Sequence, residues 1–448
     1  MALPPEAGSI PALQMIRWIR SPFALLRDCE GRLGDAFTLR MPGMPTPIVL
    51  ISDPLAVKDL FALDQDEGHA GKANVVLKPF LGEHSLLLLD GAEHMRQRKM
   101  MLPAFHGERM HAYGRAMLEL AHASIDEWPV GRRFSVHGPM QAITLQVILR
   151  TVFGVEDRAQ LVEFADVLTR ALDMAASPLL LFPFVQRDLG RLSPWGRFKR
   201  LADRASEILR GEIRRGRAQG TRGRNDVLAM MLDARDEDGS PLSEDEVHDE
   251  AITLLIAGHE TTATALAWTL RWLLPDIELV RRLQDEVATA GDDPLRIAKL
   301  DLLDATVKEA LRLQPVVPLV GRLLQEPATI GRLQLERGSL VAAAIYLVHR
   351  RPELYPEPER FNPDRFLSFK PASWEWIPFG GGLRRCIGAA FAIYEMKMVL
   401  AAILSRVDLR LATSRVRTVR RGITLTPSEG LPVIMGSRRS REVVRTAA

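Results

Sequence analysis

The residues from Ser243 to Leu274 form the longest helical pattern in the chain, and they limit the possible folds most strongly. Ser243 and Glu246 have the spacing of a capping box, apolar and small residues continue to Leu274, and Pro275 ends the run. About 32 residues at 1.5 Å each give a helix of roughly 48 Å. A helix of this length with an apolar middle has to pass through the centre of the molecule, because its side chains need cover on every side.

Helical patterns outnumber strand patterns along the rest of the chain. Apolar spacing of about 3.6 residues, together with an N-cap signal at Asp53-Pro54, predicts further helices. They are expected to begin at residue 54 and to cover residues 91–102, 140–153, 277–289, 301–313 and 388–407. The strand patterns are short: a hairpin over residues 35–40 and 47–52, and pieces at 327–335, 340–348 and 422–435. Residues 176–195 are expected to break the helices, and residues 214–224 to form a basic, glycine-rich loop.

These patterns predict a mainly α protein with small β-sheets. No linker divides the chain, and no repeat of about 20–50 residues is present. We therefore expect one domain over residues 1–448. Its ends are expected to be an N-terminal arm at residues 1–30 and a C-terminal tail at residues 436–448.

The composition is that of an ordinary globular protein. Of 448 residues, 47% are hydrophobic and 26% are charged, which excludes intrinsic disorder and fibrous repeats. The 59 basic and 56 acidic side chains give a net charge of +3, and the basic residues are scattered, so nucleic acid is not an expected partner. No apolar run reaches about 18 residues, and the first residues lack the pattern of a signal peptide. We therefore expect a soluble, cytoplasmic protein without a membrane anchor.

The two cysteines, Cys29 and Cys386, are too few for a disulfide framework. Cys386 lies near the end of the segment Pro-Phe-Gly-Gly-Gly-Leu-Arg-Arg-Cys-Ile-Gly at residues 378–388, directly before a predicted helix whose N-terminus favours a thiolate. Without a second cysteine or a histidine at a suitable spacing, it cannot build a tetrahedral zinc site. It can be the single protein ligand of an iron that a macrocycle already holds. The alternative is a buried, unreactive cysteine beside a glycine turn.

This segment matches Phe-x-x-Gly-x-Arg-x-Cys-x-Gly, and the chain resembles the cytochromes P450, the haem-thiolate monooxygenases, of the soluble bacterial type. The residues that carry the match are Phe379, Gly382, Arg384, Cys386 and Gly388. The resemblance implies haem b with Cys386 as the axial thiolate ligand of its iron, enclosed by a helical bundle with a long central helix. It further implies that Phe379 shields the sulfur, that Gly380 and Gly388 belong to the haem-binding loop, and that Arg384 pairs with a haem propionate.

The middle of the long helix carries a second motif, Ala257-Gly258-His259-Glu260-Thr261-Thr262. A threonine hydroxyl inside a helix can bond to the carbonyl four residues back, here Ala257, and bend the helix. Gly258 is expected to leave a groove beside the Thr261 hydroxyl and the Glu260 carboxylate, which together suit the binding and protonation of O2. The resemblance places Ala257 and Gly258 at the haem and makes Thr261 and Glu260 the catalytic pair. A simple bend in a packed helix is the alternative.

Glu309 and Arg312 stand three residues apart on a predicted helix and can form an ion pair. On an exposed face such a pair contributes less than about 1 kcal/mol and has no further meaning. The resemblance instead implies that Arg360, in the proline-rich segment 355–366, joins them in a buried three-member network. This network would hold the cysteine loop in place without taking part in the chemistry.

His94 and Arg98 lie one helical turn apart, so both can reach one carboxylate. Together with Arg322, they stand where the resemblance implies contacts to the haem propionates. Each of the three can also be an ordinary surface charge.

The chain contains neither a flavin-binding motif nor enough cysteines for an iron–sulfur cluster. Electrons from NAD(P)H would therefore arrive from a separate reductase through a ferredoxin or a flavodoxin. Arg96, Lys99 and Arg385 are expected to form a basic patch that docks such an acidic carrier.

The resemblance implies a monomeric monooxygenase that inserts one atom of O2 into a hydrophobic organic substrate. Hydroxylation or epoxidation of a fatty acid, terpenoid, steroid or macrolide-like compound fits this description. The pocket candidates, chosen because they are mostly aliphatic, are Leu86 and the residues up to 89, residues 179–184, Leu254, Leu255, Val317, Leu319 and Ile423. Two alternatives stay open: a haem-thiolate peroxygenase, which peroxide would drive better than NAD(P)H, and a haem-binding protein without turnover.

Overall fold

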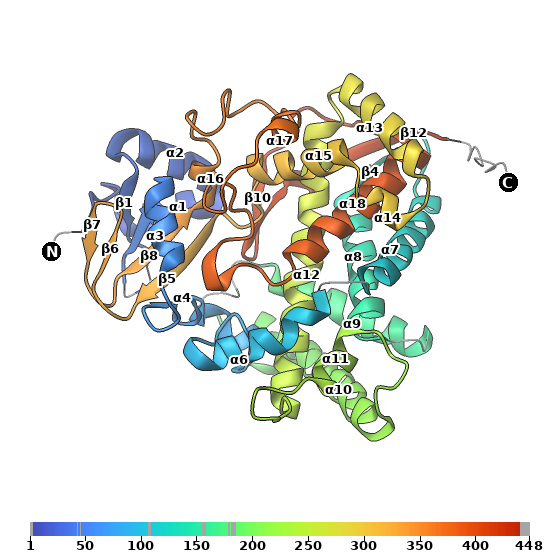
Figure 1. The fold of residues 1–448 in the computed structure, drawn as a ribbon, viewed down its shortest axis with the longest axis horizontal. Coiled ribbons are helices and arrows are strands. Elements are labelled where there is room, and N and C mark those ends of the chain that lie inside the picture. The colour runs from blue at the N-terminus through green and yellow to red at the C-terminus, as the bar shows by residue number, and fades with distance from the viewer. Residues whose placement is uncertain are drawn as a thin grey trace.

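The computed structural model describes residues 3–42, 44, 46–105, 109–154, 158–177, 180 and 185–439. Helices make up most of the molecule, and a five-stranded sheet lies at one side of it together with the N-terminal helices (Figure 1). The long helix α12 (Glu244–Leu273) runs through the middle of the molecule, where it packs against α18 (Ala389–Arg406). The chain is therefore mainly α with small sheets, as the sequence predicts.

The bounds of the elements are as follows. Before α12 the helices are α1 (Pro11–Arg20), α2 (Pro22–Leu33), α3 (Pro54–Ala62), α4 (Ala70–Ala73), α5 (Lys78–Leu81), α6 (Gly91–Met101), α7 (Arg109–Asp126), α8 (His137–Thr151), α9 (Arg158–Ala175), α10 (Pro194–Gln219) and α11 (Val227–Asp233). Between α12 and α18 come α13 (Ile277–Ala290), α14 (Pro294–Ile297), α15 (Asp301–Leu313), α16 (Ile345–Val348) and α17 (Arg365–Ser368). The strands are β1 (Ala36–Leu39), β2 (Ile48–Ile51), β3 (Gly68–His69), β4 (Arg133–Ser135), β5 (Leu319–Leu324), β6 (Ala328–Ile330), β7 (Leu333–Leu335), β8 (Leu340–Ala344), β9 (Val407–Leu411), β10 (Thr418–Arg421), β11 (Thr424–Pro427) and β12 (Pro432–Arg438).

The capping box predicted for the long helix is present. The Ser243 hydroxyl accepts from the amide of Glu246 at 3.1 Å, and the Glu246 carboxylate accepts from the amide of Ser243 at 2.6 Å. The helix ends at Leu273, two residues before Pro275. It packs against α8, α10, α15 and α18, so its central position is confirmed.

The largest sheet has the strand order β1-β2-β8-β5-β3. Strands β1 and β2 form the predicted antiparallel hairpin, with Phe37 opposite Leu50, and β2 pairs in parallel with β8. The other sheets are small: β10-β11, β4-β12-β9 and β6-β7. The β10-β11 hairpin contacts α12, and its turn is hydrogen-bonded to the residue that follows α9.

Several predicted boundaries are wrong. The piece at 340–348 is a strand only to Ala344 and then turns into α16, and the piece at 422–435 divides into β11 and β12, which belong to different sheets. The expected loop at 214–224 is helical up to Gln219, because α10 continues with two buried positions, Ile213 and Gly216, on its inner face. Periodicity in the polar half of this helix was hidden by its many arginines.

The two ends of the chain are more ordered than an arm and a tail suggest. The first 30 residues contain α1 and most of α2, and Leu25, Leu26 and Cys29 of α2 are buried against the large sheet. Strand β12 continues past residue 436 to Arg438, while residues 440–448 lie outside the described part. Within the described residues, none of the helices has the length and apolar composition that crossing a bilayer requires.

Candidate active site

The loop that carries Cys386 is closed by a backbone hydrogen bond from the Cys386 amide to the Phe379 carbonyl at 3.0 Å. Its glycines are required by their surroundings. Gly382 has φ +63°, and a Cβ atom on Gly381 would lie 2.1 Å from the ring of Phe61 in α3. The glycines therefore let this loop approach the Phe61 ring closely.

The side chain of Cys386 is accessible, although protein atoms surround its sulfur densely. Burial raises the pKa of the Cys386 thiol, while the amide of Gly388 and the guanidinium groups of Arg98 and Arg385 lower it. Gly388 is the residue just before α18, so the helix N-terminus acts on the thiol as predicted. The ring of Phe379 lies 6.1 Å from that of Trp376. Gly380, the first of the three glycines, directly follows Phe379 and turns the chain there with φ +66°.

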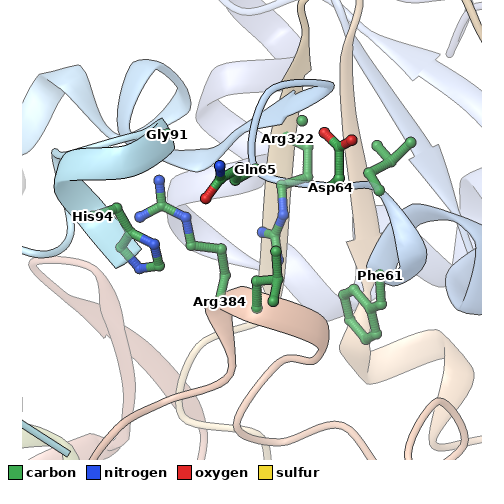
Figure 2. A pocket seen from close by; sticks show the side chains of 10 residues that line it. Phe61, Asp64, Gln65, Gly91, His94, Arg322 and Arg384 are labelled. Atoms are coloured by element: carbon green, nitrogen blue, oxygen red, sulfur yellow. The ribbon is translucent and has the colours of Figure 1, made fainter. Parts of the chain in front are cut away.

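Basic side chains converge on a pocket next to this loop. Arg384, Arg322 and His94 line it, and Gln65 lies between the two arginines with Asp64 beside Arg322 (Figure 2). The Arg322 guanidinium is 6% exposed and donates to the Gly381 carbonyl at 3.2 Å. Its pKa is lowered to about 10, first by burial and then by the nearby charge of Arg384. The site thus holds positive charge that water does not screen well.

Arg384 is held by residues that directly precede α6. It donates to the carbonyls of Leu86 and Leu89 and forms an ion pair with Asp90. Asp90 in turn accepts from the amides of Gly71 and Lys72. The carboxylate therefore orients Arg384, and it compensates only part of the positive charge.

His94 is 2% exposed, and its pKa is lowered to about 3 by burial first and then by the charges of Arg384, Arg98 and Arg322. It is neutral at pH 7 and can serve as a hydrogen-bond donor, not as a cation. Arg98, one turn later, donates to the Arg385 carbonyl at 2.7 Å. All four predicted anchor residues, His94, Arg98, Arg322 and Arg384, thus lie near one another.

This arrangement fits a haem. Three guanidinium groups and one imidazole, with too few carboxylates to balance them, suit a ligand that carries two carboxylates. A thiol whose thiolate form is stabilised by an amide and two cations suits an iron ligand. The residues present can therefore hold both the edge and the iron of the same macrocycle.

Helix α12 contains the side-chain hydrogen bond that was predicted for its middle. The Thr261 hydroxyl donates to the Ala257 carbonyl at 2.5 Å, which confirms the expected bond. Ala257, Gly258 and Thr261 stay partly exposed although the helix runs through the centre of the molecule. The groove expected at Gly258 is wrong in part: a Cβ atom there would lie 2.9 Å from Ile148 of α8. Gly258 lets α8 approach α12 closely.

Glu260 points away from this face, toward α8 and the β10-β11 hairpin. Its carboxylate accepts from Gln141 at 2.7 Å and from Thr264 at 3.3 Å, and Nε of Arg421 lies 3.2 Å from Oε1. Burial raises the pKa of Glu260, and the charge of Arg421 is the largest opposing influence. His137, 3.5 Å away, has a pKa lowered to about 4 by burial and so is neutral at pH 7.

The predicted network of Glu309 and Arg312, which we call the clamp, is present, but its third member is a different residue. Glu309 and Arg312 are both 0% exposed and joined by two hydrogen bonds of 2.6 and 2.8 Å. Arg360 is not the third partner: its side chain is 65% exposed and pairs with Glu357. Arg365, 9% exposed, takes that place with Nε 3.1 Å from Glu309. The reason is geometric, because Arg365 begins α17, which packs on α15, while the Arg360 side chain points to solvent.

The expected basic patch is largely neutralised. Arg96 pairs with Asp236 at 2.6 Å and with Glu246 at 2.7 Å, and Lys99 pairs with Glu237 at 2.8 Å. These acids lie in and around the connection between α11 and α12, which the sequence does not reveal as a neighbour of α6. Arg385 is exposed beside a hollow that Trp376 and Phe379 also line.

The pocket candidates have different surroundings. Leu86 is 7% exposed, and Leu255, at 1%, belongs to the main hydrophobic core. Leu254, Val317 and Leu319 are half-buried, and Ile423 is exposed at the β10-β11 turn. Of residues 179–184, all but Leu180 lie outside the described part.

The sequence interpretation missed the side chains that hold the functional groups in place. They are Phe61, Asp90, Gln141, Arg365 and Arg421. Only Asp90 and Arg365 had a sequence signal, since Asp90 stands directly before a predicted helix and Arg365 is the second arginine of the proline-rich segment. The others act across long sequence separations.

Comparison with known proteins decides the family. The family model described as cytochrome P450 matches residues 4–432. The chain belongs to the cytochrome P450 family. It is 39% identical over 450 residues to a protein named cytochrome P450 135B1 from Mycobacterium bovis, with 100% of this chain and 94% of the relative covered. It is 35% identical over 431 residues to one named cytochrome P450 135A1 from Mycobacterium tuberculosis, with 96% and 94% covered.

A solved structure described as retinoic acid-bound cyanobacterial CYP120A1 has the same fold, with a TM-score of 0.85 at 24% identity over 98% of this chain and 100% of that one. As a cytochrome P450, the protein is a haem monooxygenase that binds haem b through a cysteine thiolate. It uses O2, an organic substrate and redox partners.

Proposed function

We propose that this cytochrome P450 hydroxylates or epoxidises a hydrophobic organic compound of the fatty acid, terpenoid, steroid or macrolide-like kind. Cys386 is the axial ligand of the iron. The propionates are held by His94, Arg98, Arg322 and Arg384. Bound haem supplies the binding of O2 and its reductive activation.

The protein's own part is to place groups and move protons. The Thr261 hydroxyl is fixed by its bond to the Ala257 carbonyl, so it presents its oxygen at a constant position along α12. Glu260, one residue earlier, is a carboxyl group whose pKa burial raises, which suits a group that must both accept and give up a proton near neutral pH. We assign it the proton supply and Thr261 the positioning of the incoming protons.

The observation that carries the proposal is the environment of the Cys386 sulfur. The Cys386 side chain is accessible, and the amide of Gly388 and the charges of Arg98 and Arg385 favour its thiolate form against the effect of burial. Cys29, in contrast, is 0% exposed and packs in α2 among hydrophobic residues.

This contrast gives the test. The reduced protein exposed to carbon monoxide should show a strongly red-shifted Soret band, which the variant Cys386→Ser should lose. The matched control, Cys29→Ala, removes the other thiol and should keep the band. Retention of the band in Cys386→Ser, or its absence from the wild type, would refute the ligand assignment.

Substrate and partners follow from chemistry that this fold shares. The half-buried candidates Leu254, Val317 and Leu319 are aliphatic, which favours an apolar substrate. We propose electron supply from NAD(P)H through a ferredoxin or flavodoxin to a monomeric, cytoplasmic enzyme. Substrate-induced spin-state shifts across a compound library would identify the substrate class. Turnover driven better by peroxide than by NAD(P)H with carriers would favour the peroxygenase alternative.

A further inference from the structure

The guanidinium group of Arg421 connects two carboxylates on different helices. Its Nη2 atom lies 2.5 Å from Oδ1 of Asp173, and its Nε lies 3.2 Å from Oε1 of Glu260. Asp173 is in the last turn of α9, whereas Glu260 is in the middle of α12. Arg421 is the last residue of β10, so a short hairpin bridges the two helices.

The two contacts differ in kind. Nη2 of Arg421 donates a hydrogen bond to Asp173, but the Nε–H is not aligned for a hydrogen bond to Glu260. The second contact is thus an ion pair through space, whose strength changes with small shifts of either partner. The Arg421 side chain is 29% exposed and that of Glu260 is 16% exposed, so screening by water is incomplete.

The polar groups of α8 and α12 around Glu260 carry no charge at pH 7. On α8, Gln141 is neutral, and the pKa of His137 is lowered to about 4 by burial. On α12, Thr264 is neutral, and burial lowers the pKa of His259 to about 4. On α9, Asp173 is the acid that competes for Arg421. Among the described residues that face it, Glu260 therefore relies on Arg421 for its counter-charge.

The hairpin also rests directly on the end of α9. The amide of Gly422 donates to the Ala176 carbonyl at 2.6 Å, immediately after Arg421 and just beyond the last residue of α9. Because this bond ties the hairpin turn to the end of α9, a displacement of that end moves Asp173 and the hairpin together relative to α12, and with them the distance between Arg421 and Glu260.

We propose that Arg421 is a positioning residue that holds the Glu260 carboxylate toward α8 and divides its charge between Glu260 and Asp173, so that docking of the β10-β11 turn on α9 sets how readily Glu260 gives up a proton. This inference rests on the proposed function of Glu260 as the proton carrier. It predicts that loss of Arg421 and loss of Asp173 act in opposite directions.

The sign follows from electrostatics. Without Arg421, the ionised form of Glu260 loses its counter-charge, and its pKa rises further. Without Asp173, the charge of Arg421 acts on Glu260 alone, and the pKa of Glu260 falls. We expect Arg421→Gln to raise this pKa by about one unit and Asp173→Asn to lower it by about half a unit.

Thermal stability measures this pKa without relying on activity. Since burial raises the folded-state pKa of Glu260, its contribution to stability is present below the unfolded-state pKa and is lost as pH rises through the folded-state pKa. The melting temperature of the holoenzyme, minus that of the same protein carrying Glu260→Gln, is followed from about pH 4 to about pH 9. The difference falls between the unfolded-state and folded-state pKa values, so its midpoint moves up or down with the Glu260 pKa in the wild type, in Arg421→Gln and in Asp173→Asn.

Opposite shifts of the two midpoints, with Arg421→Lys close to wild type, would support the proposal. Equal or parallel shifts, or an unmoved midpoint in Arg421→Gln, would show that Arg421 is only a structural tie. The exposed Asp173 makes its variant a safe test, because its side chain is 59% exposed and its loss should not prevent folding.

The failure of the proposed function gives a different result. If Glu260→Gln leaves the ratio of product to NAD(P)H unchanged, Glu260 is not the proton carrier, whatever the midpoints show. If that ratio falls while the midpoints do not move, only the role of Arg421 is wrong.

Discussion

Two carboxylates of this protein are paired with arginines in very different ways. Glu309 is 0% exposed and receives two hydrogen bonds from Arg312 and one from Arg365. Glu260 is 16% exposed and has one guanidinium group beside it, Arg421, which is also bonded to another acid. Glu309 thus has two guanidinium groups beside it, whereas Glu260 shares a single one with a second acid.

The donors of Arg312 show why the first network is fixed. Beyond its two bonds to Glu309, it donates to the carbonyls of His349, Pro358 and Arg360, so five hydrogen bonds use its five N–H groups. A side chain in this state has no alternative partner and no reason to move. Both residues of the pair belong to α15, and Arg312 connects this helix to the segment that precedes the cysteine loop. The position of that loop has to be rigid. Incomplete pairing at Glu260 leaves its protonation adjustable, which a proton carrier requires.

The largest effect is expected from breaking the saturated network. Glu309→Ala leaves Arg312 as a buried charge without its acid, which costs about 3–5 kcal/mol of stability. We expect protein that retains little or no haem, measured as the ratio of Soret to protein absorbance after purification. Normal haem content in this variant would mean that the clamp does not hold the cysteine loop.

An intermediate effect on stability is expected from removing the third member of the clamp, and it distinguishes Arg365 from Arg360. Arg365→Ala removes a nearly buried charge-assisted hydrogen bond to Glu309, worth about 1.5–3 kcal/mol. Its matched control, Arg360→Ala, removes an exposed side chain and should change stability by less than about 0.5 kcal/mol. Melting temperatures of the two holoenzymes give the ranking. A larger fall for Arg360→Ala would restore the partner that the resemblance implies.

The smallest effect separates charge from hydrogen bonding at Glu260. Gln141→Leu removes a neutral donor at 2.7 Å and leaves Arg421 in place. The pKa of Glu260 should rise, because the bond favours its ionised form, but by less than in Arg421→Gln, about half a unit. The melting-temperature difference against pH measures it. A rise larger than that in Arg421→Gln would place the control of Glu260 in α8 instead of the hairpin.

The sequence predicted well whatever depends on neighbours along the chain. The capping box at Ser243, the bond from Thr261 to the Ala257 carbonyl and the pair of Glu309 with Arg312 are all within four residues. Helical geometry repeats, so such contacts follow from spacing alone. Similarity of the cysteine segment to a family supplied the rest of the site.

The errors share the opposite property. Arg365 was passed over for Arg360, and the neutralisation of Arg96 by Asp236 was not foreseen. In each case the right partner depends on the direction in which a side chain leaves an irregular segment, and spacing does not determine that direction. The surroundings of Gly258 could not be predicted from spacing either, because the side chain that packs against it, Ile148, comes from another helix.

By itself, the amino-acid order determined the central helix and several others, the caps at Ser243 and Asp53, and the family to which the chain belongs, because these depend on short-range periodicity and a local motif. Only the tertiary structure decided which cation stands beside Glu260, which ring requires the glycines before Cys386, and which arginine completes the clamp. The physical reason is that charge and packing act through space, and the fold alone sets which distant residues share it.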